Sequence, residues 1–294
     1  MNWSRTKSIF IVTFFLLNIF LGWQFSDLVR NQLVSIEEST GILGRLDQNN
    51  IDLPEGEVNV NNARGVVLEG GRTTFTEEDV AGLPEQEVEL SQSGSTITAL
   101  FEEPIDISEL LEDDSSLQPL LSRYMLYGSD YVYARTEENF IYFNQLYGQV
   151  EAHVNDDEPL VVEINDEGEA IGYTQRHFAF VENNTEDREI LNYMTAIESL
   201  LNNHYILRNN SIVDIEFGYY SLADQTPRFF SPMWAVTVDQ TLETSEEPVI
   251  RIYLVNAVLG DQHQWYPDET NIDEEEDEEE ELNEEPALPG NQEL

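Results

Sequence analysis

Hydrophobic residues fill the chain from residue 8 to residue 25, which reads SIFIVTFFLLNIFLGWQF and contains no charged side chain. A helix of this length spans roughly 27 Å, close to the hydrocarbon thickness of a bilayer. Arg5 and Lys7 precede the run, and the first acid after it is Asp27. Because positive charge stays on the cytoplasmic side, we predict one transmembrane helix with a cytoplasmic N-terminus and an extracytoplasmic remainder.

A cleaved signal peptide is the alternative, since it too begins with positive charge followed by an apolar run. The segment that leaves the run reads GWQFSDL, which lacks a small-x-small cleavage site, and the apolar core is longer and bulkier than usual. These features favour an uncleaved anchor in the cell membrane.

Helical spacing continues beyond the anchor into a juxtamembrane stalk over residues 26–54. An apolar stripe of this kind either docks on the protein's own domain or pairs with a helix of another protein. Gly41 weakens a continuous helix, which favours docking. The stripe consists of Val29, Leu33, Ile36, Leu43 and Leu46.

Short alternating apolar runs bounded by turn residues predict strands in a first folded unit, residues 55–150. The strand segments read RGVVLEGG, EVELSQSGSTITALF, DYVYAR and NFIYFNQLYG. TFTEEDVAGL predicts one helical turn capped by threonine, and Asp106–Tyr127 predicts a helix broken around Pro119.

A second unit, residues 151–266, begins with a hairpin whose turn ends at Gly168. A helix over Glu186–Asn203 follows, with Asn184 or Thr185 as its cap. Three more strands are predicted, which gives an antiparallel sheet with a helix across one face. The strands are Leu160–Ile164 and Ala170–Val181 in the hairpin, then Ile212–Ser221, Phe229–Asp239 and Val249–Leu259.

The chain ends in an acidic segment without periodicity, which predicts a disordered tail. The predicted fold class is therefore α+β: a transmembrane helix, an ectodomain of two mixed units with antiparallel sheets and packed helices, and this tail. The expected divisions are 1–7 (cytoplasmic), 8–25 (anchor), 26–54 (stalk), 55–150 and 151–266 (the two units) and 267–294 (tail).

Charge and composition exclude several function classes. The chain has 13 basic and 59 acidic residues and a formal net charge of −46, so it repels nucleic acid. Lys7 is the sole lysine, and this acid-rich composition indicates a habitat of high salt or high pH. No cysteine is present, which excludes disulfides and thiolate chemistry.

No sequence motif supports an enzyme, a cofactor or a metal site. The GxSxG, GxGxxG and Walker patterns are absent, and the abundant carboxylates form no informative pair. Glu163–Gly168 imitates half of an EF-hand loop, but Thr174 takes the place of the bidentate glutamate. The four histidines, none in a metal-ligand spacing, are His153, His177, His204 and His263.

Asn18 is the amide in the middle of the apolar run, and Gly22 lies one turn further on the same face. The amide can form a hydrogen bond to another helix, which Gly22 would allow to approach closely, or it can bond to its own backbone. Both alternatives stay open from the sequence.

The opening MNWSRTKSIFIVTFFLLNIFLGWQF resembles the N-terminus of the YycI (WalI) family. The similarity continues over about residues 1 to 260, through NIDLP, YGSDYVYA, PMWAV and two aromatic-x-Gln segments around Gln145 and Gln175. Those two segments also give a weak indication of internal duplication. The tail after Asp268 has no counterpart in the family.

The resemblance implies a membrane-anchored, non-enzymatic protein that acts with a YycH-type partner on the WalK (YycG) sensor histidine kinase and so tunes cell-wall metabolism. It implies two domains of the YycH fold, no catalytic residues and contact between the anchor and the kinase's own transmembrane helices. The sign of regulation varies among relatives. The helical stripe that we predict as the membrane contact is Ile11, Phe14, Asn18, Gly22 and Phe25.

A membrane-tethered module that binds a wall fragment is the competing hypothesis. It requires aromatic side chains that line a cleft, although aromatic strand residues more often belong to a core. The candidates are Tyr142, Tyr147, Tyr173, Tyr219, Tyr220 and Trp234.

Overall fold

A computed structural model describes residues 13–14, 17–18, 41–54, 56, 58–60, 63–107, 117–155, 158–183, 188–223, 227–242 and 248–266. Thr13, Phe14, Leu17 and Asn18 are helical, and the rest of the predicted anchor lies outside the described residues. The predicted tail, residues 267–294, lies outside them as well. Within the described ranges, no helix is both long and apolar enough to cross a membrane.

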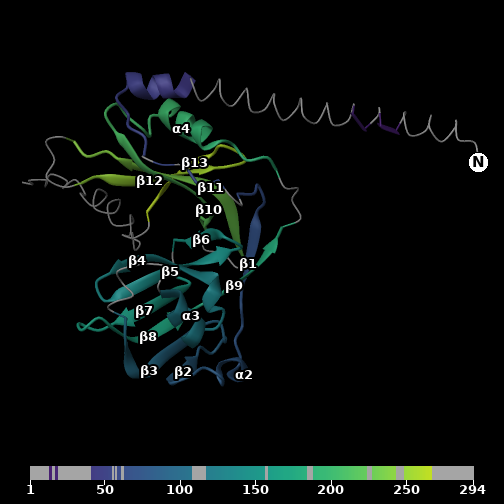
Figure 1. The fold of residues 1–294 in the computed structure, drawn as a ribbon, viewed down its shortest axis with the longest axis vertical. Coiled ribbons are helices and arrows are strands. Elements are labelled where there is room, and N and C mark those ends of the chain that lie inside the picture. The colour runs from purple at the N-terminus through teal and green to yellow at the C-terminus, as the bar shows by residue number, and fades with distance from the viewer. Residues whose placement is uncertain are drawn as a thin grey trace, which may run out of the picture.

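The described residues form a mainly β structure with few helices (Figure 1). The helices are α2 (Glu77–Val80), α3 (Gln118–Tyr124) and α4 (Tyr193–Asn202), with a 3-10 turn, η3 (Gly128–Asp130). The strands are β1 (Leu68–Arg72), β2 (Gln86–Leu90), β3 (Ile97–Asp106), β4 (Tyr131–Glu137), β5 (Phe140–Tyr147), β6 (Val150–Val154), β7 (Leu160–Ile164), β8 (Glu169–Gln175), β9 (Phe178–Glu182), β10 (Ser211–Ser221), β11 (Arg228–Asp239), β12 (Ile250–Asn256) and β13 (Gln262–Trp265).

Strand β5 is the branch point of the sheet. One edge of β5 pairs with β4, and the other pairs first with β7 and then, from Gln145 onward, with β6. From β7 the sheet continues through β8 and β3 to β2, and from β6 it continues through β10, β11 and β12 to β13. The sheet therefore has a β2–β8 half and a β10–β13 half, and in Figure 1 the β10–β13 half lies above the β2–β8 half.

Each half has its own hydrophobic core. In the β2–β8 half, α3 packs through Leu120 and Leu121 onto strand residues such as Phe143 and Val162. In the β10–β13 half, α4 packs through Ile197 and Leu200 onto residues of β10, β11 and β12. Both helices therefore bury an apolar face against antiparallel strands, as the sequence predicts.

The end of the stalk docks on the β10–β13 half. Residues 41–48 are helical and lie beside α4 (Figure 1), and Ile42, Leu46 and Ile51 are buried in the same core as α4. The Arg45 guanidinium lies 2.6 Å from Glu198 Oε1, and Ile212 N–H donates to the Asp52 carbonyl at 2.8 Å. The docking alternative is confirmed for Leu46 of the predicted stripe, whereas Leu43 is exposed and Val29, Leu33 and Ile36 lie outside the described residues.

Several predicted elements are confirmed and several are wrong in their bounds. Thr76 caps α2 with a reciprocal hydrogen-bond pair to Asp79, and Gly168 adopts φ +80° in the predicted hairpin turn. Pro119 lies in the first turn of α3 and does not break a helix there. Residues 108–116, in the predicted N-terminal part of that helix, lie outside the described residues.

Helix α4 begins later than predicted, because its cap is Asn192, whose side-chain oxygen accepts from Met194 N–H. Upstream, Arg188 forms an isolated bridge with Gly65, which holds that segment extended. The predicted caps, Asn184 and Thr185, lie outside the described residues. The strands β6 and β13 were not predicted, and the predicted strand Ala170–Val181 is two strands, β8 and β9.

The predicted division after residue 150 crosses the pairing of the sheet. Strands β7 and β8 follow that point in the chain, yet they pair with β5 and β3 of the β2–β8 half. Strand β1, from the first predicted unit, pairs with β11 of the β10–β13 half and with β9, which follows β8 in the chain.

Candidate functional site

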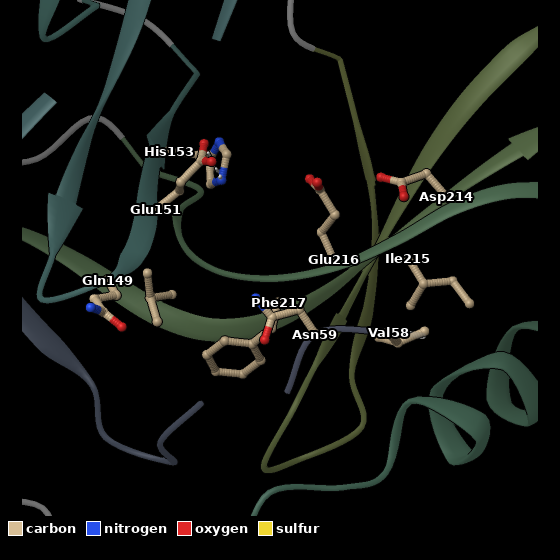
Figure 2. A pocket seen from close by; sticks show the side chains of 10 residues that line it. Val58, Asn59, Gln149, Glu151, His153, Asp214, Ile215, Glu216 and Phe217 are labelled. Carbon is tan, nitrogen blue, oxygen red and sulfur yellow. Dashed lines mark ion pairs between the residues drawn. The ribbon is translucent and has the colours of Figure 1, made fainter. Parts of the chain in front are cut away.

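A pocket of about 280 Å³ lies where β6 and β10 separate. These two strands are parallel and pair over three residues each, Ala152–Val154 with Tyr219–Ser221. Toward their N-terminal ends the strands diverge, and the space between them forms the pocket (Figure 2). Its walls are Gln149, Val150, Glu151 and His153 from β6 and its turn, Asp214–Phe217 from β10, and Val58 and Asn59.

Strand alternation gives the pocket one charged side and one apolar side. Glu151, His153 and Glu216 project to the same side in Figure 2, whereas Ile215 and Phe217 project to the other. Ile215 is buried in the core beneath α4, and Phe217 packs against that core. We call Glu151, His153, Asp214 and Glu216 the fork residues.

Among the fork residues, His153 is neutral and packs against an aromatic ring. Its ring stacks on Tyr220 with the ring centroids 4.2 Å apart and an interplanar angle of 10°. Gly218 makes room for this pair, because a Cβ there would lie 3.0 Å from His153 Nε2 and 2.9 Å from Tyr220 Cε2. Burial lowers the pKa of His153 to about 4, so its imidazole carries no positive charge near neutral pH.

Both fork glutamates hold protons more tightly than usual. Desolvation raises the pKa of Glu151, although the Asn144 amide donates to its Oε2 at 2.8 Å and opposes that rise. Loss of hydration, followed by the charges of Asp214 and Glu151, raises the pKa of Glu216 to about 7. Glu216 stays in contact with solvent, so dissolved salt screens part of this repulsion.

This arrangement can bind and release protons near neutral pH. The residues that line the pocket, all within the described part of the chain, include no lysine or arginine to offset the carboxylates. The described ranges also contain no group of three or more histidine or acidic side chains arranged to hold a metal ion.

A second polar cluster joins β1, η3 and the link between β8 and β9. His177 Nδ1 lies 2.8 Å from Thr73 Oγ1, and its Nε2 lies 3.3 Å from Asp130 Oδ2. This order of hydroxyl, imidazole and carboxylate is also found in hydrolases, where the nucleophile needs an oxyanion hole and an open cleft. Here the Tyr127 ring stacks over His177 at 4.4 Å, and burial lowers the pKa of His177. The cluster ties three segments together.

The structure describes part of the predicted membrane stripe. Phe14 and Asn18 are helical and exposed, and the Asn18 amide donates to the Phe14 carbonyl at 2.8 Å. One of its N–H groups therefore bonds to its own backbone, which was one of the two alternatives. Ile11, Gly22 and Phe25 lie outside the described residues.

The six aromatic residues proposed for a ligand cleft do not line one cleft, although Tyr147 packs edge to face on Tyr219 with the ring centroids 5.7 Å apart. Tyr173, Tyr219, Tyr220 and Trp234 are buried, and each belongs to a different hydrophobic cluster. The remaining two, Tyr142 and Tyr147, lie under the Arg135 guanidinium and against Phe180, respectively. The core alternative therefore describes them better than a shared cleft.

Sequence reasoning did not single out the fork residues. Glu151 and His153 lie in the unpredicted strand β6, and their partners in β10 are more than 60 residues away in the chain. The alternation of Glu151, Ala152, His153 and Val154 was the one local signal for a strand with a polar face.

Comparison with known proteins identifies the family. The profile of the family described as "YycI protein" matches residues 30–258, which is most of the chain. The chain belongs to the YycI family. This family regulates the WalK (YycG) kinase system and is a regulatory family, not one known for enzymes. The predicted resemblance to this family is thus confirmed, and the match includes β1 to β12 and the end of the stalk, whereas residues 1–29 and β13 lie outside it.

No curated protein sequence matches the chain. Among solved structures, it is similar to an uncharacterized protein from Eubacterium rectale with 10% sequence identity and a TM-score of 0.46. That similarity covers 74% of this chain and 91% of the other.

Proposed function

We propose that this protein is a non-enzymatic, extracytoplasmic accessory regulator of a WalK-type sensor histidine kinase that controls cell-wall metabolism. It acts together with a YycH-type partner and is held in the cell membrane by a single span, residues 8–25, with the N-terminus in the cytoplasm. The observation that carries this proposal is the family match over residues 30–258.

The docked stalk supports a mechanical link between anchor and ectodomain. Ile42 and Leu46 are buried beside α4, so residues 41–48, at the end of the stalk, enter the β10–β13 half as a packed helix. We expect this docking to transmit a movement of the ectodomain to the anchor.

The mechanism requires contacts that differ between two states of the kinase. A regulator that touches both signalling states equally shifts neither, whatever its affinity. We place the contact in the stripe Ile11, Phe14, Asn18, Gly22 and Phe25. The Asn18 bond to Phe14 leaves the amide oxygen and a second N–H for a neighbouring helix.

Reconstitution tests this proposal. The full-length protein and a WalK-type kinase are placed together in lipid nanodiscs, and the rate of kinase autophosphorylation is measured with and without the protein. We expect the native protein to change the rate in either direction, and Asn18→Leu to reduce that change by weakening association. A kinase rate that is the same with and without the native protein would contradict the proposal.

A further inference from the structure

At the junction between the two halves, one face of the sheet is packed with apolar side chains and the other face carries the fork residues. On the apolar face, Val150, Ala152 and Val154 of β6 are buried with Tyr219 of β10. Leu68 of β1, Phe178 of β9 and Phe230 of β11 join the same cluster, and β1 pairs with both β9 and β11. This apolar side holds the halves together.

The opposite face carries acidic side chains that repel one another and so oppose a closer approach of β6 to β10. From β6, the groups are Glu151 and the neutral His153; from β10, they are Asp214, Glu216 and the hydroxyl of Tyr220. Among the described residues, the third wall contributes Val58 and Asn59, which do not titrate. Ionised Glu151 and Glu216 repel each other across the pocket, and the lining residues in the described ranges include no cation to offset them.

We propose that the β6 and β10 junction is a proton-controlled joint: protonation of the fork glutamates closes it, and their ionisation opens it and changes the angle between the β2–β8 half and the β10–β13 half. The apolar cluster on the other face acts as the hinge. This joint is a property of the fold and does not rest on the kinase assignment.

The sign of the response follows from the direction of the pKa shifts. In the described arrangement, loss of hydration raises the pKa of both fork glutamates because it disfavours their ionised forms. Ionisation therefore favours an arrangement in which the two carboxylates are further apart and better hydrated, so we expect closure at low pH and opening as the pH rises. For Glu216 the raised pKa is about 7, which places the response near neutral pH.

The docked stalk determines which half of the sheet would move relative to the anchor. Leu46 and Arg45 bind the stalk to α4, which belongs to the β10–β13 half. Opening would therefore move the β2–β8 half relative to the segment that leads to the anchor.

Distances between spin labels test the joint directly, and the absence of cysteine makes the labelling specific. Leu100→Cys on β3 and Leu259→Cys beyond β12 place one label on each half at exposed positions. The full chain in nanodiscs is measured by double electron–electron resonance at about pH 5 and about pH 8.5, on either side of the Glu216 titration. We expect the distance distribution to shift as the pH rises.

The matched variants decide the cause. The doubly substituted Glu151→Gln, Glu216→Gln protein should give one distribution at both pH values, whereas Glu163→Gln, an exposed carboxylate on β7, should keep the native response. If the double variant does not fold, the single variant Glu216→Gln, at a solvent-facing position, replaces it in the same measurement. An unchanged native distribution, or a response that persists without the fork carboxylates, would overturn the proposal.

Salt provides an independent check on the same samples. At about 1 M salt the screening length falls to roughly 3 Å, which weakens repulsion across the pocket. The pH-dependent shift should shrink; a shift of equal size at low and high salt would also contradict the joint.

Discussion

The side-chain amide of Gln145 forms two hydrogen bonds with the backbone of Phe178, donating from Nε2 to its carbonyl and accepting its N–H at Oε1, both at 2.8 Å. Gln145 is 1% exposed, so these bonds are shielded from water. In this way the end of β5 is joined to the first residue of β9 by a side chain that imitates a strand partner. Gln175 has a related role, since its buried amide donates to the Leu126 carbonyl and to the Tyr131 hydroxyl.

Gln145→Leu should destabilise the protein by about 2 kcal/mol or more, because a buried N–H and a buried carbonyl of Phe178 lose their partners. Urea unfolding measures the effect. Gln92→Leu, in the exposed turn between β2 and β3, is the control and should change stability by less than about 0.5 kcal/mol. Equal losses in the two variants would show that the amide bonds to Phe178 do not matter.

The stalk offers two leucines with opposite environments. Leu46 is 2% exposed and buried in the core beside α4, whereas Leu43 is 47% exposed. Leu46→Ala should cost about 2–5 kcal/mol through lost burial and a new cavity, and Leu43→Ala should cost less than about 0.5 kcal/mol. Thermal unfolding of the full chain distinguishes them. A mild Leu46→Ala would mean that the stalk is not docked on the β10–β13 half.

A structural feature can be predicted from the sequence when the residues that determine it lie close together in the chain. The Thr76 cap and the Gly168 turn were predicted correctly because the residues that form them lie within a few positions of each other. The late start of α4 was missed because Arg188 is held by Gly65, more than a hundred positions earlier. A cap signal at Asn184 could not reveal that competing contact.

The fork illustrates the same limit. Glu151 becomes informative only when the parallel pairing of β6 with β10 brings it toward Glu216, and parallel pairing leaves no local turn signal in the sequence. Among 59 acidic residues, no local pattern distinguishes these two. Conversely, Trp234 and Tyr219 were correctly expected to be core residues, because aromatic residues in alternating strands usually are.

Gly218 should tolerate no side chain without a cost. A Cβ at this position would lie 3.0 Å from the His153 ring and 2.9 Å from Tyr220, so Gly218→Ala must displace the stacked pair. We expect a loss of about 1–3 kcal/mol from overpacking, measured by urea unfolding. Gly71→Ala on β1, where a Cβ meets nothing within 4 Å, is the matched control. A Gly218→Ala protein as stable as this control would contradict the close packing of His153 on Tyr220.

His153 should make stability depend on acid. Its folded pKa is lowered from 6.5 to about 4, so the unfolded chain binds the proton more readily and stability is lost as the pH falls from about 6.5 toward 4. His153→Phe keeps a ring against Tyr220 and removes the titration. The difference in unfolding free energy between the two proteins should therefore change across this pH range. A constant difference would show that His153 is not shielded from water.

The most direct test of the central claim is co-purification from the native host. Tagged full-length protein is compared with a version whose residues 8–25 are replaced by an unrelated apolar span, and the retained proteins are identified by mass spectrometry. We predict that a WalK-type sensor kinase and a YycH-type protein accompany the native protein, and that the kinase is lost when the span is replaced. If the kinase binds both versions, recognition lies in the ectodomain and not in the span; if neither version retains a kinase or a YycH-type protein, the proposed regulatory complex is contradicted.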